Sequence, residues 1–193
     1  MGLAGLTLTL FLKTLKETKP QKIISLGVPN LVGLGNPKTV LKKANATLFT
    51  MDAANWEGCD FVHDLNYPVP EEFWNSADMV IDPGTIEHVF NTHEAMMSVH
   101  RMLRVGGVAF HHSPLNWINH GYHNFSPCLF IEWYEANNYY VETYLRNGCG
   151  KSVPWNPDPK VTTILPKRSV MDIVAVKKKE TKEPIIPNQR RYT

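Results

Sequence analysis

Four short apolar runs in the first half of the chain each end on a glycine or an acid, and this pattern constrains the fold more than any other feature. The runs cover residues 22–27, 47–52, 59–64 and 78–82, and a fifth apolar run covers 108–112. Their length and their ends are typical of buried β-strands. Helical stretches are expected at 38–43 and 91–104. Buried strands that alternate with helices predict a parallel sheet covered on both faces.

The second half of the chain predicts how the sheet ends. The helix at 91–104 has Asn91 and Glu94 as a cap pair and should stop at the Gly106–Gly107 pair. A helix at 126–137, a strand at 139–146, a Pro- and Gly-rich loop at 148–166 and a strong strand at 169–177 follow. Together these elements predict an α/β, Rossmann-like, doubly wound and mainly parallel seven-stranded sheet with a C-terminal antiparallel strand pair.

The two ends of the chain differ in character. Residues 1–20 predict an N-terminal helix whose leucines form one apolar stripe, and the apolar part is shorter than the ~20 residues of a membrane span. Residues 1–176 should form a single domain, and the charged segment 177–193 should be a disordered tail. The leucines of the expected stripe are Leu3, Leu6, Leu10, Leu12 and Leu15.

Charge and cysteine content exclude several classes of partner. The 193 residues include 20 Lys and Arg and 18 Asp and Glu, so the net charge of +2 favours neither a nucleic-acid nor a membrane partner. Three widely spaced cysteines form no disulfide framework and suit a reducing compartment. We therefore expect a cytoplasmic protein with a small-molecule partner, and a homodimer stays open.

Polar residues at the strand ends are the first candidate site. Ligands of open parallel sheets bind at the carboxyl ends of the strands. There Gly27 would let backbone approach a ligand, Asp52 could accept from a ribose diol, and Asp64 could accept from an adenine amino group. Asp82 ends the next strand in the same way. The alternative is that each aspartate is only a turn former or a helix cap.

Residues 78–114, DMVIDPGTIEHVFNTHEAMMSVHRMLRVGGVAFHHSP, resemble the centre of class I S-adenosylmethionine-dependent methyltransferases. The resemblance implies a methyltransferase with S-adenosyl-L-methionine as cofactor, bound by Gly27, Asp52, Asp64, Asp82 and Glu87. The first strand of that family normally leads into a Gly-x-Gly-x-Gly loop, whereas Pro29 stands here where the second glycine is expected. The residues that match the family are Gly84, Glu87, His88, Val89, Leu103, Gly106, Gly107 and Pro114.

Residues 119–127 resemble a motif of a methyltransferase-like subgroup associated with sugar and polysaccharide pathways. This resemblance implies a small hydroxylated acceptor such as a sugar. Aromatic residues after the fifth strand, such as Trp117 and Tyr122, suit a sugar or a planar ring, although others fit a buried helix face. The alternative function is a catalytically inactive binding or assembly module that keeps the fold.

Histidines gather around the same expected edge. His120 or His123 could be the general base that takes the proton of an acceptor hydroxyl. Glu87 and His88 with His112 or His120 could instead bind a metal ion through mixed oxygen and nitrogen ligands, and a third reading makes Glu87 and His88 mere helix caps. His111 and His112 are neighbours on a strand, so they must point to opposite faces of the sheet.

Overall fold

The computed structural model describes residues 2–55, 58–158, 160–181 and 184–192. The helices are α1 (Gly5–Thr18), α2 (Pro37–Lys43), α3 (Thr92–Met102) and α4 (Pro127–Ala136), with short 3₁₀ turns η1 (Glu71–Phe73), η2 (Ile86–His88) and η3 (Arg190–Tyr192). The strands are β1 (Gly2–Leu3), β2 (Lys22–Leu26), β3 (Asn30–Leu31), β4 (Thr47–Asp52), β5 (Phe61–Val62), β6 (Ala77–Asp82), β7 (Leu103–Pro114), β8 (Tyr139–Arg146) and β9 (Val170–Lys177).

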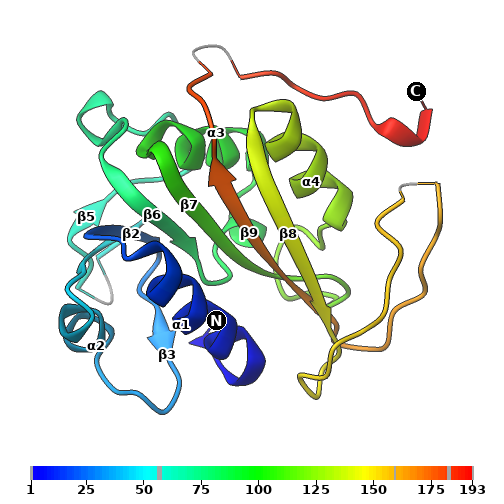
Figure 1. Ribbon diagram of the computed structural model, residues 1–193, viewed down its shortest axis with the longest axis horizontal. Helices are drawn as coiled ribbons and strands as arrows, with labels where there is room; N and C mark the ends of the chain where they lie inside the picture. Colours follow the sequence, from blue (N-terminus) through cyan, green and yellow to red (C-terminus); the bar gives the residue numbers. More distant parts are fainter. Residues whose placement is uncertain (1, 56–57, 159, 182–183, 193) are drawn as a thin grey trace.

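Seven of these strands form one sheet in the order β5-β4-β2-β6-β7-β9-β8 (Figure 1). The first five pair in parallel, and β9 runs antiparallel between β7 and β8. The strand order reverses beside β2, so the carboxyl ends of β2 and β6 flank the usual ligand crevice. The predicted α/β class, the seven-stranded sheet and its antiparallel C-terminal pair are confirmed.

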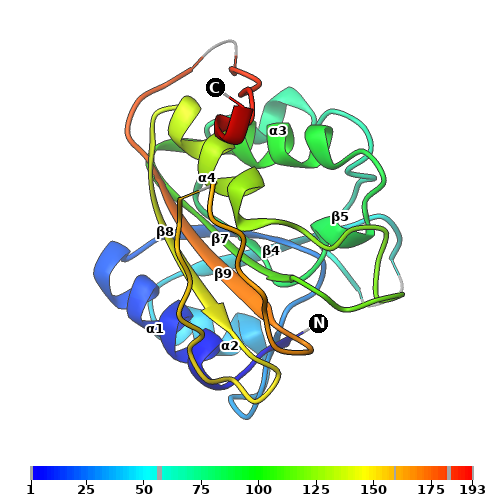
Figure 2. The same cartoon turned by 90° about the vertical axis from the view of Figure 1, so that its right-hand side faces the viewer.

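Helices cover both faces of the sheet, as the continuous apolar runs predict. Figure 2 shows α3 and α4 on one side of the sheet and α1 and α2 on the other. Each side has its own apolar cluster, one containing Met96, Val99 and Phe130 and the other containing Phe11 and Leu41. Parallel strands that are buried on both faces carry apolar residues at nearly every position, which is why β2 has no polar face.

The N-terminal helix is present, but its buried face differs from the predicted leucine stripe. Leu6 and Leu12 are exposed, whereas the buried residues are Thr7, Leu8, Phe11, Thr14 and Leu15. The difference arises from a polar contact, because the Thr7 hydroxyl donates a hydrogen bond to the buried carboxylate of Asp172 in β9. This bond turns the face of α1 that carries Thr7 toward the sheet. In the described ranges, no helix is long and apolar enough to cross a membrane.

The helix expected at 91–104 ends earlier than its glycine pair. The side chain of Asn91 caps α3 by accepting from Glu94 N, as predicted. The helix stops at Met102, and Gly106 and Gly107 lie inside β7 instead. Gly106 has a φ of 81°, and a Cβ on Gly107 would lie 2.8 Å from the Arg104 carbonyl oxygen. The glycines therefore make an irregular start of the strand, where the register with β6 shifts.

The segment 177–193 begins inside the sheet, since Lys177 is the last residue of β9. Further on, the amide of Asn137 donates to the Ile185 carbonyl and its oxygen accepts from Ile185 N. Arg190 pairs with Glu135 of α4 at 2.6 Å. These contacts attach described parts of the segment to α4, and the disorder expected of the tail stays a prediction.

Candidate functional site

Gly27, Asp52 and Thr85 meet at the carboxyl edge of the sheet. Gly27 has a φ of 77°, and a Cβ there would lie 2.9 Å from Thr85 Oγ1 and 3.8 Å from Asp52 Oδ2. The Thr85 hydroxyl donates to the Leu26 carbonyl at 2.6 Å, which fixes it over the glycine. Asp52 is half-buried, and its carboxylate accepts no hydrogen bond within the described part of the chain. The close approach of Thr85 explains the glycine, and the corner offers the unpaired Asp52 carboxylate to a ligand.

Asp64 and Asp82 have other partners. Asp64 is exposed, and its Oδ1 accepts from the backbone and side-chain nitrogens of Asn66, the geometry of a turn former. Asp82 is fully buried: its Oδ1 accepts from Thr85 N at 2.7 Å, and its Oδ2 pairs with His111 Nδ1 at 2.9 Å. Because its carboxylate already accepts from the Thr85 loop and pairs with His111, Asp82 holds that loop in this structure, and its contact with a cofactor stays a prediction.

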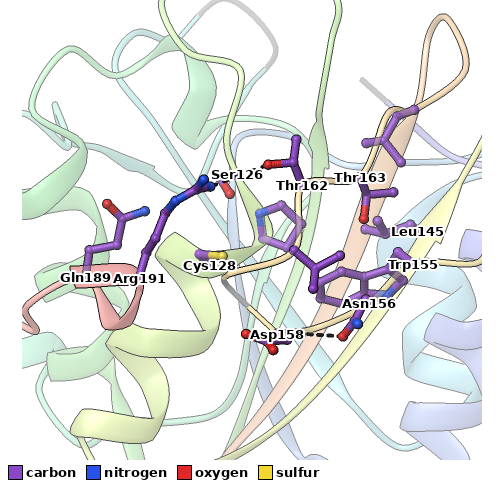
Figure 3. A pocket seen from close by; sticks show the side chains of 13 residues that line it. Ser126, Cys128, Leu145, Trp155, Asn156, Asp158, Thr162, Thr163, Gln189 and Arg191 are labelled. Atoms are coloured by element: carbon purple, nitrogen blue, oxygen red, sulfur yellow. Dashed lines mark hydrogen bonds between the residues drawn. The ribbon is translucent and has the colours of Figure 1, made fainter. Parts of the chain in front are cut away.

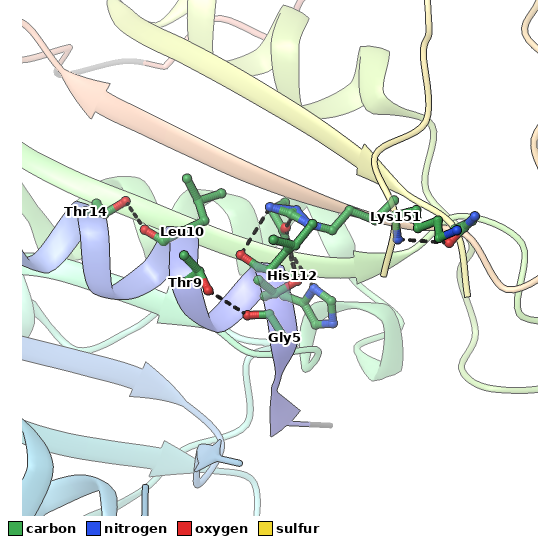
Figure 4. A network of polar contacts seen from close by, with 11 residues as sticks. Gly5, Thr9, Leu10, Thr14, His112 and Lys151 are labelled. Carbon is green, nitrogen blue, oxygen red and sulfur yellow. Dashed lines mark hydrogen bonds and ion pairs between the residues drawn. The ribbon is translucent and has the colours of Figure 1, made fainter. Parts of the chain in front are cut away.

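His111 and His112 point to opposite faces, as predicted. His111 is buried on the α4 side, where Nε2 lies 2.6 Å from the Tyr134 hydroxyl. His112 turns to the α1 side, where Nδ1 donates to Asp172 at 2.7 Å (Figure 4). Arg146 pairs with the same carboxylate at 2.7 Å. His112 therefore lies across the sheet from Glu87 and His88, and the predicted metal set that includes it is wrong.

Glu87, His88 and His120 form the one group of potential metal ligands found in the described residues. One ligand atom of each lies within 4.8 Å of the others. His120 Nε2 is 3.6 Å from Glu87 Oε1. The ring centroids of His88 and His120 are 5.0 Å apart, and the two ring planes are inclined at 65°. Glu87 is fully buried, His120 is half-buried and His88 is exposed. Of the alternatives left open, the structure brings together the set with His120.

Residues 120–123, which include His120, pack closely against η2. A Cβ on Gly121 would lie 2.7 Å from the Glu87 carbonyl oxygen and 3.1 Å from Glu87 Cγ. His123 N donates to the same carbonyl at 3.1 Å, and its ring Nε2 lies 3.3 Å from the Phe90 carbonyl oxygen. A carbonyl only accepts, so Nε2 of His123 carries the proton. His123 thus fixes the segment, while Nε2 of His120 has no hydrogen-bond partner within the described ranges.

Burial dominates the electrostatics of this cluster. It raises the pKa of Glu87 to about 8, and the nearby Asp82 carboxylate adds to the rise. Both carboxyl oxygens of Glu87 are buried without a hydrogen-bond partner among the described residues. Burial also lowers the pKa of His88, and His120 contributes to that shift. An unpaired buried carboxyl group beside two imidazoles is costly in a fold and is typical of functional sites.

Two hollows lie on the side of α4. A groove of about 420 Å³ has a mostly apolar lining that includes His123, Phe125 and Trp133. A second cavity of about 220 Å³ lies between the start of α4, the β8–β9 loop and the tail, with Cys128 and Trp155 on its walls (Figure 3). Only the groove contains a residue that the sequence had suggested as catalytic, namely His123.

Sequence reasoning missed Thr85, Asp172 and Tyr134. Thr85 lies within the segment that resembles methyltransferases but is not one of its matching positions. Asp172 was the better signal, because an aspartate in the middle of an apolar strand needs a buried partner. Tyr134 belongs to the helix face that the sequence assigned to the core, where it contacts His111.

Comparisons with known proteins add information at the level of the fold. No known family and no curated protein match the sequence. Solved structures do match. The citrinin polyketide synthase CMeT domain superposes with a TM-score of 0.58 at 12% identity, over 91% of this chain and 52% of that chain. TehB from Haemophilus influenzae superposes with a TM-score of 0.58 at 12% identity, over 86% of this chain and 61% of that chain. Haemonchus contortus phosphoethanolamine N-methyltransferase 2, solved with S-adenosylhomocysteine and phosphomonomethylethanolamine, is similar (TM-score 0.57, 12% identity, 89% of this chain and 53% of that chain).

The chain thus spans between half and about three fifths of these structures' lengths. At this identity the likeness concerns the architecture alone. The chain has the Rossmann-like fold of class I methyltransferases, with the same mostly parallel sheet and antiparallel final pair.

Proposed function

We propose that this chain is an S-adenosylmethionine-dependent methyltransferase that acts on a small hydroxylated acceptor. The main support is Asp52, whose carboxylate has no hydrogen-bond partner among the described residues and lies beside Gly27 at the strand ends where this fold binds its ligands. The Haemonchus enzyme of the same fold was solved with the demethylated cofactor, which agrees with this proposal. A sugar is the acceptor that the motif at 119–127 favours.

In the proposed complex Asp52 would accept hydrogen bonds from the two hydroxyls of the cofactor ribose, and Gly27 would lie beside the cofactor. Asp64 remains the candidate for the adenine amino group, after release of its turn to Asn66. Glu87, which is fully buried beside His120, remains a candidate for contact with the cofactor. Asp82 keeps the Thr85 loop in place.

His120 is the group that we propose to take the acceptor proton. Its Nε2 has no hydrogen-bond partner in the described structure and lies 3.6 Å from Glu87 Oε1, so the Glu87 carboxyl group can stabilise the imidazolium that would form. His123 remains the second candidate, but its Nε2 proton is committed to the Phe90 carbonyl. When bound, the cofactor would supply the methyl group and its sulfur would keep the electron pair of the carbon–sulfur bond, while His120 would hold the acceptor proton.

Calorimetric titration with S-adenosylmethionine and with its demethylated product tests the cofactor. Asp52→Ala removes two charge-assisted hydrogen bonds of roughly 1.5–3 kcal/mol each, so the affinity should fall at least tenfold. The matched control is Asp60→Asn, which removes a nearby carboxylate that Lys38 and Thr50 already bind. The control should retain affinity. Equal affinities of Asp52→Ala and the parent protein would refute the ribose contact.

The transfer step has its own test. His120→Ala should leave cofactor affinity intact and slow transfer to hydroxylated acceptors by about 10²–10⁴. His123→Ala is the comparison, because it removes a neighbouring imidazole from the same segment. Transfer that is slow only in His123→Ala would move the base role to His123.

A catalytically inactive module is the second candidate function, and one observation favours it. After Gly27 the chain turns into β3, which pairs with β1, and Pro29 restricts the path that a glycine-rich loop would take. If no cofactor heat appears at high micromolar concentrations with the parent protein, the module is the better description.

A further inference from the structure

We propose that Glu87, His88 and His120 bind a divalent first-row transition-metal ion, such as Zn²⁺, Co²⁺ or Mn²⁺. One ligand atom from each side chain lies within 4.8 Å of the other two, a spacing that a small side-chain adjustment closes onto one ion. Two imidazoles and a carboxylate suit these ions, whereas Mg²⁺ and Ca²⁺ prefer all-oxygen sites. The binding of the ion itself does not depend on the proposed methyltransferase activity.

The buried carboxyl group is the observation that points to a ligand. Glu87 is 0% exposed, and neither of its oxygens has a hydrogen-bond partner among the described residues. Nε2 of His120 is likewise buried and unpaired at 3.6 Å from Glu87 Oε1. Polar atoms in such positions are normally satisfied by a partner, water or an ion. A metal ion between them would satisfy all three atoms at once.

The surrounding structure keeps these ligands in place. The Cβ-free Gly121 packs directly on the Glu87 backbone, so His120 cannot move away from Glu87 without displacing its whole segment. Trp117 packs edge-on against the His120 ring at 5.3 Å. His88 is the exposed member and gives an ion its route from solvent. Three protein ligands leave at least one coordination position open, which is the pattern of a catalytic site.

The role of the ion rests on the proposed function. An acceptor hydroxyl at the open position would lose its proton to solvent more readily, because the ion lowers the pKa of a bound oxygen. In the loaded protein the lone pair of His120 Nε2 belongs to the ion, so His120 acts as a ligand. The base role described above then applies to the metal-free protein.

Titration of the chelator-treated full chain with Co²⁺, followed by visible absorption, tests the site. We expect one ion per chain, competition by Zn²⁺, and a melting temperature raised by about 5–10 °C at a hundredfold excess over Kd. Glu87→Gln and His120→Ala should each weaken binding at least tenfold. His88→Gln should do the same, and because His88 is exposed this variant tests the site even where the buried variants fail to fold.

His63→Gln is the matched control, since it removes a histidine that is not in the cluster. It should bind Co²⁺ as the parent protein does. Absence of stoichiometric binding by the parent at millimolar Co²⁺, or equal weakening in His63→Gln and His88→Gln, would overturn the proposal. Cofactor titration of the same samples separates the two ideas: Co²⁺ binding without cofactor binding retains the metal site and rejects the methyltransferase.

Discussion

The buried network around Asp172 should be the most sensitive electrostatic element of the fold. Asp172 of β9 is fully buried and accepts hydrogen bonds from Arg146 at 2.7 Å, His112 at 2.7 Å and Thr7 at 3.1 Å. It therefore connects α1, β7 and β8 through one carboxylate. Asp172→Asn keeps the shape of the side chain but presents an NH₂ group to donors and leaves the buried Arg146 charge unpaired.

The magnitude follows from that unpaired charge. Removing one partner of a buried ion pair costs about 3–5 kcal/mol, a large share of the roughly 5–15 kcal/mol by which domains are stable. Urea unfolding followed by tryptophan fluorescence measures the change in the free energy of unfolding. Glu17→Gln is the matched control, because its ion pair with Lys13 is 3.8 Å long and 61% exposed and should contribute less than about 1 kcal/mol.

The double variant Asp172→Asn/Arg146→Met tests the mechanism itself. If the cost comes from a stranded guanidinium, removal of that group should restore part of the lost stability, with a coupling of about 1 kcal/mol or more. A loss below about 1 kcal/mol for Asp172→Asn, or two single losses that simply add in the double variant, would refute the reasoning.

Two further predictions concern pH and loop position. Burial lowers the pKa of His100 from 6.5, and its neutral ring accepts a hydrogen bond from the Tyr139 hydroxyl and donates one to the Thr181 carbonyl. The imidazole therefore binds a proton more readily in the unfolded chain than in the folded protein. The contribution of neutral His100 to the free energy of unfolding should therefore be fully present above pH 6.5 and should decrease at lower pH. Urea unfolding across this pH range should show a smaller decrease for His100→Gln than for the parent protein. Gly121→Ala should displace the segment on Glu87 and slow transfer about 10–100-fold at unchanged cofactor affinity in calorimetry.

The sheet was predictable because most of its strands are apolar runs whose ends are marked in the sequence by a polar residue or a glycine. Residues 47–52 and 139–146 form strands with the predicted limits, and the polar residue at the end of β4 ends the run of apolar side chains. The strand expected at 59–64 shrinks to Phe61–Val62, since only two residues pair with β4 at the edge of the sheet. The other edge strand, β8, pairs with β9 along all eight of its residues and keeps its predicted limits, so the extent of pairing with the neighbouring strand decides the length.

Helix faces and polar partners were less predictable because they depend on residues far away in the chain. Thr7 is buried on account of Asp172, 165 residues later, and no local period contains that information. The same holds for Asp82, whose partner His111 comes from the neighbouring strand. The alternation of side chains along β7 did predict that His111 and His112 point to opposite faces, since that rule is purely local.

The difference between Asp82 and Glu87 says most about the site. Both acids are fully buried, Asp82 as the last residue of β6 and Glu87 five residues later. Asp82 is satisfied by three backbone amides and a histidine, whereas Glu87 has no hydrogen-bond partner in the described ranges. A glutamine of the same shape would have a smaller desolvation cost than a carboxylate if stability alone mattered. The unpaired acid beside two imidazoles therefore supports the proposed cation site.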